Sequence, residues 1–178
     1  PHPDPTWPLL LPMVKSAVRA MDATQSFLGG LGNPVTIADF IVGGASKRGW
    51  TTWLTAVADT RVRAIIPIVI DVLNMDEQMT HHRLAYQGYD PNDAEHNLYG
   101  GYSTAIHDYV EMNIFGRFGT PAADDLLKIV DPYEYLERLT MPQLILNSTG
   151  DQFFLPDSSK FFWQNLPCVN WLNDTPTT

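Results

Sequence analysis

The sequence has a single cysteine, Cys168, and only 11 basic residues against 20 acidic ones. One cysteine excludes an intramolecular disulfide and a cysteine-rich zinc site. The formal net charge of −9 argues against wholesale binding to nucleic acid or to an anionic membrane surface. No apolar run approaches the roughly 20 residues that cross a bilayer, so we expect no membrane span.

The chain also lacks an initiator methionine, a recognisable signal peptide, internal repeats and low-complexity tracts. It opens on Pro1-His2-Pro3 and ends on Thr177-Thr178 without a closing motif, which favours a fragment or a processed chain. Its 178 residues are enough for one domain with a real core, and 44% of them are hydrophobic. This composition indicates a globular protein rather than a disordered one.

Apolar residues recur at helical spacing in some segments and form short β-branched runs in others. The expected helices and strands outside the middle of the chain are a helix at 9–28, a strand at 35–42, a helix at 47–58, and strands at 62–70, 142–147 and 168–172. Strand, helix and strand in close succession form a βαβ unit with a right-handed crossover. The fold class is therefore α/β, with a mostly parallel sheet flanked by helices.

The segment 71–130 differs in texture, because it is rich in Tyr, His, Asn and Gly and is weakly periodic. We expect helices in it near 75–87, 102–115 and 122–129, and interpret the segment as a helical insertion above the sheet. Two carboxylates are expected to begin helices further along. They are Asp131, before a helix at 132–138, and Asp157, before one at 157–165.

The chemistry is concentrated in the turn Gly43-Gly44-Ala45-Ser46-Lys47-Arg48-Gly49, between an apolar strand and an amphipathic helix. Small neighbours allow a sharp turn at the serine, and the helix start directs N–H groups and partial positive charge at a reacting oxygen. Ser46 is thus a candidate nucleophile and the backbone N–H of Lys47 a candidate oxyanion donor. The common pattern is Gly-x-Ser-x-Gly, and here Arg48 displaces the second glycine to Gly49.

Two alternatives for this turn stay open. Ser46 could be the N-cap of a plain β–α turn, or Lys47 and Arg48 could form an anion site at the helix start. The acid that would accompany a nucleophile follows a later strand. Order and location favour Asp151, in Thr149-Gly150-Asp151, over its rival Asp71.

The histidine of such a site would follow the acid, but no histidine follows Asp151. The earlier histidines are expected to be exposed or hydrogen-bonded on helices near a cleft; they are His81, His82, His96 and His107. His81 and His82 could suggest a metal pair, but the side chains of adjacent residues point apart, and no Glu completes a His-Glu-x-x-His pattern. We therefore expect no metal and no cofactor.

The string from Gly43 to Leu54 (GGASKRGWTTWL) resembles the signature of the PhoPQ-activated pathogenicity-related protein family, which includes autocrine proliferation repressor-type proteins. Further segments resemble this family and extend the likeness from about Trp7 to Leu166; they are 12–22, 61–71, 130–133 and 149–158. The resemblance implies an α/β-hydrolase-like fold with Ser46 as nucleophile and Asp151 as acid, without a cofactor.

The resemblance also implies parts that this chain does not contain. The family pattern continues to a histidine in a Pro-Asn-x-x-His-like segment, where this chain reads Val169-Asn170-Trp171-Leu172 and soon ends. Either the sequence is truncated just before this histidine or its end has diverged from the family. It also has a long N-terminal part, usually with secretion signals, that carries the first strands and a second oxyanion donor. We expect 1–178 to be one incomplete α/β-hydrolase domain, with 71–130 as a cap or lid, inactive in isolation.

Two functions follow from the resemblance. The first is a serine hydrolase that cleaves a small-molecule ester or a peptide. The alternative is a secreted signalling or binding protein on a non-catalytic hydrolase scaffold, whose aromatic surface recognises a protein partner, because a scaffold can outlive its chemistry. The secretion signals of the family imply an extracellular or periplasmic location.

Overall fold

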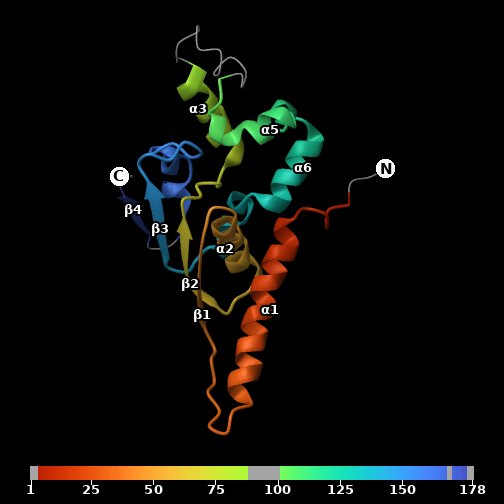
Figure 1. Cartoon of the computed structure of the whole chain (residues 1–178), viewed down its shortest axis with the longest axis vertical. Helices are drawn as coiled ribbons and strands as arrows, with labels where there is room; N and C mark the ends of the chain where they lie inside the picture. Colours follow the sequence, from red (N-terminus) through yellow and green to blue (C-terminus); the bar gives the residue numbers. More distant parts are fainter. Residues whose placement is uncertain (1–3, 88–100, 168–169, 176–178) are drawn as a thin grey trace. The chain divides into compact units, whose positions relative to one another are not determined.

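The computed structural model describes residues 4–87, 101–167 and 170–175 (Figure 1). The chain divides into two compact units. The first contains Pro1–Ile70, Tyr135–Leu146 and Asn165–Asn173. The second contains Asp71–Glu134, Asn147–Gln164 and Asp174–Thr178.

The first unit is built on the predicted βαβ arrangement. Its elements, with the strands that continue the sheet, are α1 (Leu10–Gly29), β1 (Phe40–Ala45), α2 (Lys47–Ala58), β2 (Val62–Ile68), β3 (Gln143–Ser148) and β4 (Asn170–Thr175). The described strands form one sheet in the order β1-β2-β3-β4. The pairs β1–β2 and β2–β3 are parallel, so the predicted α/β class with a parallel sheet is confirmed.

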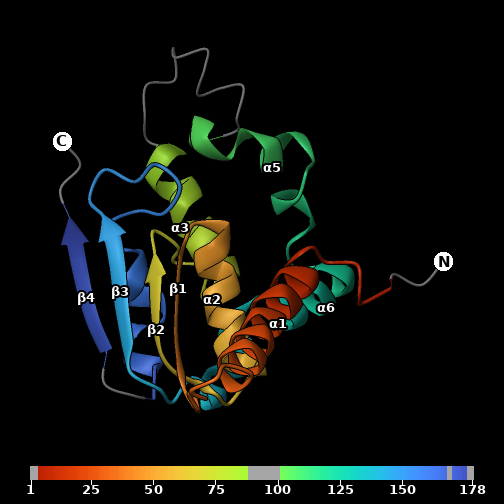
Figure 2. The same ribbon diagram turned by 60° about the horizontal axis from the view of Figure 1, so that its bottom comes forward.

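Burial of apolar side chains explains why the helix α2 forms. Trp53 and Leu54 of α2 are buried, and α2 packs against β1, β2 and α1 (Figure 2). Ile65 of β2 is also buried. This core holds the turn between β1 and α2 on a rigid strand and a rigid helix.

Several strand boundaries differ from the prediction, and two of the differences have a clear physical reason. β1 begins at Phe40 rather than at 35, because its partner β2 begins only at Val62, with which Phe40 is in register. The carbonyl of Ile37 accepts a hydrogen bond from the Gln25 side chain (2.6 Å). β2 ends at Ile68 because Val69 adopts φ 48°, which a strand cannot continue through.

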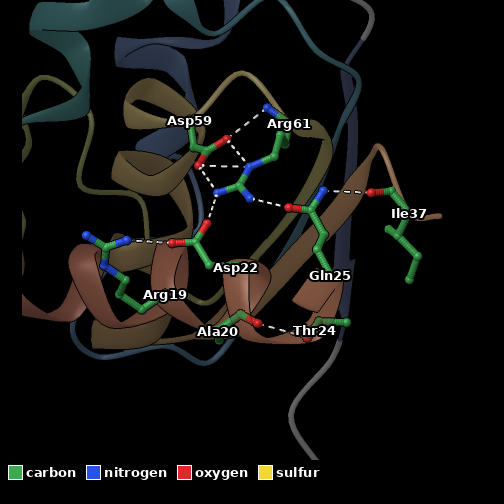
Figure 3. A network of polar contacts seen from close by, with 8 residues as sticks. All are labelled: Arg19, Ala20, Asp22, Thr24, Gln25, Ile37, Asp59 and Arg61. Carbon is green, nitrogen blue, oxygen red and sulfur yellow. Dashed lines mark hydrogen bonds and ion pairs between the residues drawn. The ribbon is translucent and has the colours of Figure 1, made fainter. Parts of the chain in front are cut away.

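An arginine ties the first unit together at the turn between α2 and β2 (Figure 3). The Arg61 guanidinium donates to Asp59 (2.6 and 2.9 Å), pairs with Asp22 of α1 (2.8 Å) and donates to Gln25 (2.6 Å). These hydrogen bonds from Arg61 lower the pKa of the Asp59 carboxyl. Because Gln25 also donates to Ile37, one guanidinium links α1, the approach to β1 and the end of α2.

The described part of the second unit is mainly helical, and most of its elements lie in the predicted insertion. Its elements are α3 (Met75–Gln87), η1 (Thr104–Ile106), α5 (His107–Glu111), η2 (Phe115–Arg117), α6 (Pro121–Val130) and η4 (Ser158–Phe161). Two further short helices, η3 (Pro132–Arg138) and η5 (Trp163–Asn165), include residues of both units. The predicted helix at 102–115 is confirmed only in part, because it is broken into the short helices η1, α5 and η2 and Asn113 has φ 51°.

The two carboxylates expected to begin helices behave differently. Asp131 accepts from the Tyr133 amide as predicted (2.9 Å), and also from the Met75 amide at the start of α3 (2.8 Å). Burial raises the pKa of Asp131 to about 6, against the lowering effect of these hydrogen bonds. Asp157 precedes η4 as predicted, but its side chain makes no cap hydrogen bond and instead pairs with His81 and Lys160.

No helix within the described ranges combines the length and the apolar character needed to span a membrane.

Candidate functional site

Ser46 is the single residue between β1 and α2, and its backbone is strained. Its φ is 53° and its ψ is −126°, a combination that costs a non-glycine residue energy and persists only where neighbouring contacts enforce it. The Ser46 amide donates to the Ile68 carbonyl (2.9 Å), and its carbonyl accepts from the Trp50 amide (3.0 Å). These two bonds fix the turn from both sides.

The Ser46 side chain is exposed and makes no hydrogen bond to the first turn of α2. The alternative in which this hydroxyl caps the helix is therefore wrong. The Lys47 amide is at the first position of α2, where N–H groups have no acceptor within the helix. The side chains of Lys47 and Arg48 are exposed. Because Ser46 directly precedes α2, its hydroxyl lies at the end of the helix that carries partial positive charge.

Two glycines make the turn sterically possible. A Cβ on Gly44 would lie 2.8 Å from the backbone of Arg48. A Cβ on Gly49 would lie 2.8 Å from the Gly44 carbonyl and would also collide with the Ile70 side chain. The glycine that the common motif has one position earlier is thus needed here at 49, while Arg48 points its side chain to solvent.

The two candidate acids lie in the second unit and have different surroundings. Asp151, in the loop after β3, is half-buried, and its Oδ1 accepts from the amides of Phe153 (2.7 Å) and Phe154 (3.2 Å). Its Oδ2 makes no hydrogen bond within the described residues. One oxygen is thus used to shape the loop, and the other is available to a partner.

Asp71 is only 1% exposed. One of its oxygens accepts from the Asn147 amide group (2.8 Å), and the other has no hydrogen-bond partner among the residues that the structure describes. Burial, with smaller contributions from the charges of Asp174 and Asp151, raises the pKa of Asp71 to about 7 against the effect of Asn147. A buried, often protonated carboxyl is less suited than Asp151 to stabilise a charged histidine.

The described histidines are hydrogen-bonded, as predicted. His82 is buried, its Nε2 accepts from the Ser103 amide (3.1 Å) and its Nδ1 faces the Phe153 carbonyl (3.1 Å). Burial lowers the pKa of His82 to about 4, so it is neutral with its proton on Nδ1. His81 pairs with Asp157 (2.8 Å) and His107 with Thr104 (2.9 Å). His96 lies outside the described residues.

Sequence reasoning missed the role of His82 as a support for the acid loop. Phe153 accepts from His82 through its carbonyl and donates to Asp151 through its amide. This contact joins residues 71 positions apart, and nothing in the local pattern indicates it. No group of three or more His, Cys, Asp or Glu side chains suited to a metal occurs among the described residues.

The first unit has a hollow of about 840 Å³ at the opposite end of α2 from Ser46, between the last turn of the helix and residues 138–142. The 12 residues of α2 separate it from Ser46 by roughly 17 Å. It is therefore too distant to hold a group that reacts at Ser46.

The comparisons with known proteins agree with this arrangement. The model of the PhoPQ-activated pathogenicity-related protein family matches residues 1–178. Autocrine proliferation repressor protein A of Dictyostelium discoideum is 42% identical over 163 residues, which are 92% of this chain and 30% of that protein. The chain thus spans under a third of the length of this curated relative.

Two solved structures share the fold at low sequence identity. An acetyl xylan esterase from Paenibacillus sp. R4 is 16% identical with a TM-score of 0.60, over 98% of this chain and 48% of the esterase. An acylaminoacyl peptidase from Pyrococcus horikoshii is 11% identical with a TM-score of 0.60, over 93% of this chain and 23% of the peptidase. The sheet and helices described above form part of the α/β-hydrolase fold of these proteins.

Proposed function

The chain belongs to the PhoPQ-activated pathogenicity-related protein family, and on that premise we propose that Ser46 is the nucleophile of a serine hydrolase that cleaves an ester or a peptide bond. The observation that carries the proposal is the backbone of Ser46, held at φ 53° between β1 and α2 with its side chain exposed. Strain of this kind is enforced by packing and is concentrated at functional sites. A plain connection between strand and helix has no need of it.

The reaction follows from the surroundings of the serine. Ser46 Oγ attacks the carbonyl carbon of the substrate while a histidine base takes the hydroxyl proton. The Lys47 amide and the N-terminal end of α2 stabilise the oxyanion that forms. The histidine then protonates the departing alcohol or amine, and water releases the acyl group by the same steps in reverse order.

Asp151 is the acid that we assign to this site. Its role is to orient the histidine and to stabilise the positive charge that the histidine carries during the reaction. Its placement after β3, with one oxygen free of loop contacts, supports this assignment. No histidine follows Asp151 in this chain, and the chain spans only 30% of its curated relative; we propose that the base is a histidine outside residues 1–178.

The test is covalent labelling by a fluorophosphonate, which reacts with activated serines. The protein is expressed with the sequence that flanks this chain in its natural gene, and Ser46→Ala is compared with Ser26→Ala, a change at an exposed serine of α1. We expect labelling of the wild type and of Ser26→Ala, and none of Ser46→Ala. Labelling that survives Ser46→Ala refutes the nucleophile, and a folded wild type without labelling favours the non-catalytic binding protein.

A further inference from the structure

The second unit contains a cavity of about 250 Å³ that the proposed chemistry at Ser46 does not involve. One wall is a stripe of α3 with residues at helical spacing, from Asp76 through the buried Met79 to Arg83. The other wall consists of Tyr102, Phe115 and Phe118. The cavity therefore has an aromatic side and a helical side that carries both signs of charge.

The aromatic wall is held together by contacts among its own rings. Tyr102 and Phe115 are stacked with ring centroids 4.8 Å apart, and Phe118 meets Phe115 edge-on at 5.8 Å. Tyr102 also stacks on the buried His82, whose ring is held by two hydrogen bonds. A wall fixed in this way loses little conformational entropy on binding.

The charges lie at the two ends of the α3 stripe. Asp76 and Arg83 are seven residues apart, which places their Cα atoms about 10 Å apart along the helix axis. Both are exposed, and neither forms an ion pair within the described ranges. A ligand with an ammonium at one end and a carboxylate at the other matches this order.

The volume of the cavity limits the class of ligand that it can hold. A volume of 250 Å³ holds one aromatic side chain and part of a backbone. An extended tripeptide spans about 10 Å between its ends, which is comparable with the separation of the Asp76 and Arg83 Cα atoms along α3. We propose that this cavity binds a short peptide of about three residues with free termini and a central aromatic side chain, its ammonium at Asp76, its ring against Phe115 and its carboxylate at Arg83.

The experiment is calorimetric titration of Gly-Phe-Gly into the protein carrying Ser46→Ala, so that hydrolysis cannot consume the peptide. We expect saturable binding, weakened about tenfold or more for Gly-Gly-Gly, because the ring loses its burial. N-acetylation or C-amidation of Gly-Phe-Gly should each weaken binding about two- to fivefold, as expected for exposed charge pairs.

Two variants test which charged residue binds each terminus of the peptide. Asp76→Asn should weaken Gly-Phe-Gly but leave the acetylated peptide unchanged, and Arg83→Gln should do the same for the amidated peptide. Asp125→Asn and Arg63→Gln change exposed charges outside the cavity and should alter neither. Absence of saturable binding, or binding that ignores Asp76→Asn and Arg83→Gln, overturns the proposal. Because binding is measured without Ser46, failure of the hydrolase proposal leaves this result intact.

Discussion

Three residues close together in the sequence each meet one steric requirement of the turn at the end of β1. Ser46 takes the positive φ, Gly44 leaves room for the backbone of Arg48, and Gly49 leaves room for the Gly44 carbonyl. The sequence located this turn, because glycines near a serine between an apolar strand and an amphipathic helix are a local pattern. The local pattern could not predict the positive φ of Ser46, because this angle depends on a hydrogen bond to Ile68 of the next strand.

We expect Gly44→Ala to lower the free energy of unfolding by about 1–3 kcal/mol, because its Cβ would overpack the backbone of Arg48. Urea denaturation measures the change. Gly32→Ala is the matched control, since a Cβ there meets no heavy atom within 4 Å and should change stability little. Equal effects of the two substitutions would contradict the steric account of this turn.

The pH dependence of stability should reveal Asp71. Its pKa is about 7 in the folded chain against a usual value of 3.8, so the folded state binds more protons than the unfolded state between these values. The stability that Asp71 contributes therefore falls as pH rises from about 4 to 7.

Asp71→Asn removes this dependence, and its carbonyl can still accept from Asn147. We expect the variant to be more stable than the wild type at pH 8, by about 1–3 kcal/mol, and to lose this advantage near pH 4. Urea denaturation at the two pH values measures it, with the exposed Asp125→Asn as a control that should show no such pH-dependent gain. A constant difference between wild type and Asp71→Asn would rule out titration of Asp71.

At the scale of elements, the limits of a helix followed from local sequence pattern, whereas the limits of a strand depended on its pairing with another strand. α2 begins and ends at the predicted residues 47 and 58, because its apolar spacing and the glycine turn before it are local information. β1 was predicted five residues too early, since the limit of a strand is set by its partner, here Val62. The helix predicted at 157–165 is replaced by the short helices η4 and η5, and the Asp157 carboxylate pairs with His81, a residue 76 positions away, which no local pattern indicates.

Arg61 should be the most sensitive charged residue of the first unit. Arg61→Lys keeps the charge but loses the fork that reaches Asp59, Asp22 and Gln25 together, so we expect a lower denaturation midpoint. Arg63→Lys is the matched control two residues away, because Arg63 is exposed and, among the described residues, pairs only with Asp39 at 3.6 Å. Thermal unfolding followed by circular dichroism compares them, and equal midpoints would show that the fork contributes nothing.

For the whole molecule, the order of the described strands places β1 at one end of the sheet. Ile41 on this strand is 70% exposed. An apolar strand with unpaired backbone groups is a site for pairing with another chain. The alternation of helices and strands was sufficient to predict the α/β class, but it could not indicate which strand would be last in the sheet, since strand order is not a local property.

We therefore expect a protein limited to residues 1–178 to self-associate at high concentration through β1. Ile41→Lys should weaken this association about tenfold or more, because a charge at a sheet edge opposes pairing. Leu126→Lys makes the same change at an exposed leucine of α6 and should have no such effect. Light scattering after size-exclusion chromatography at several concentrations measures the mass, and a monomer at all concentrations would contradict this prediction.

The positive φ of Ser46 also has an evolutionary consequence. Glycine adopts this backbone conformation without penalty, so replacing the serine by glycine would relieve the strain and raise stability. A lineage that keeps the scaffold only for binding is free to accept that change, whereas a lineage that depends on the hydroxyl must retain the less stable serine. On the proposed function, we therefore expect glycine at position 46 more often in relatives without hydrolase activity than in relatives that have it.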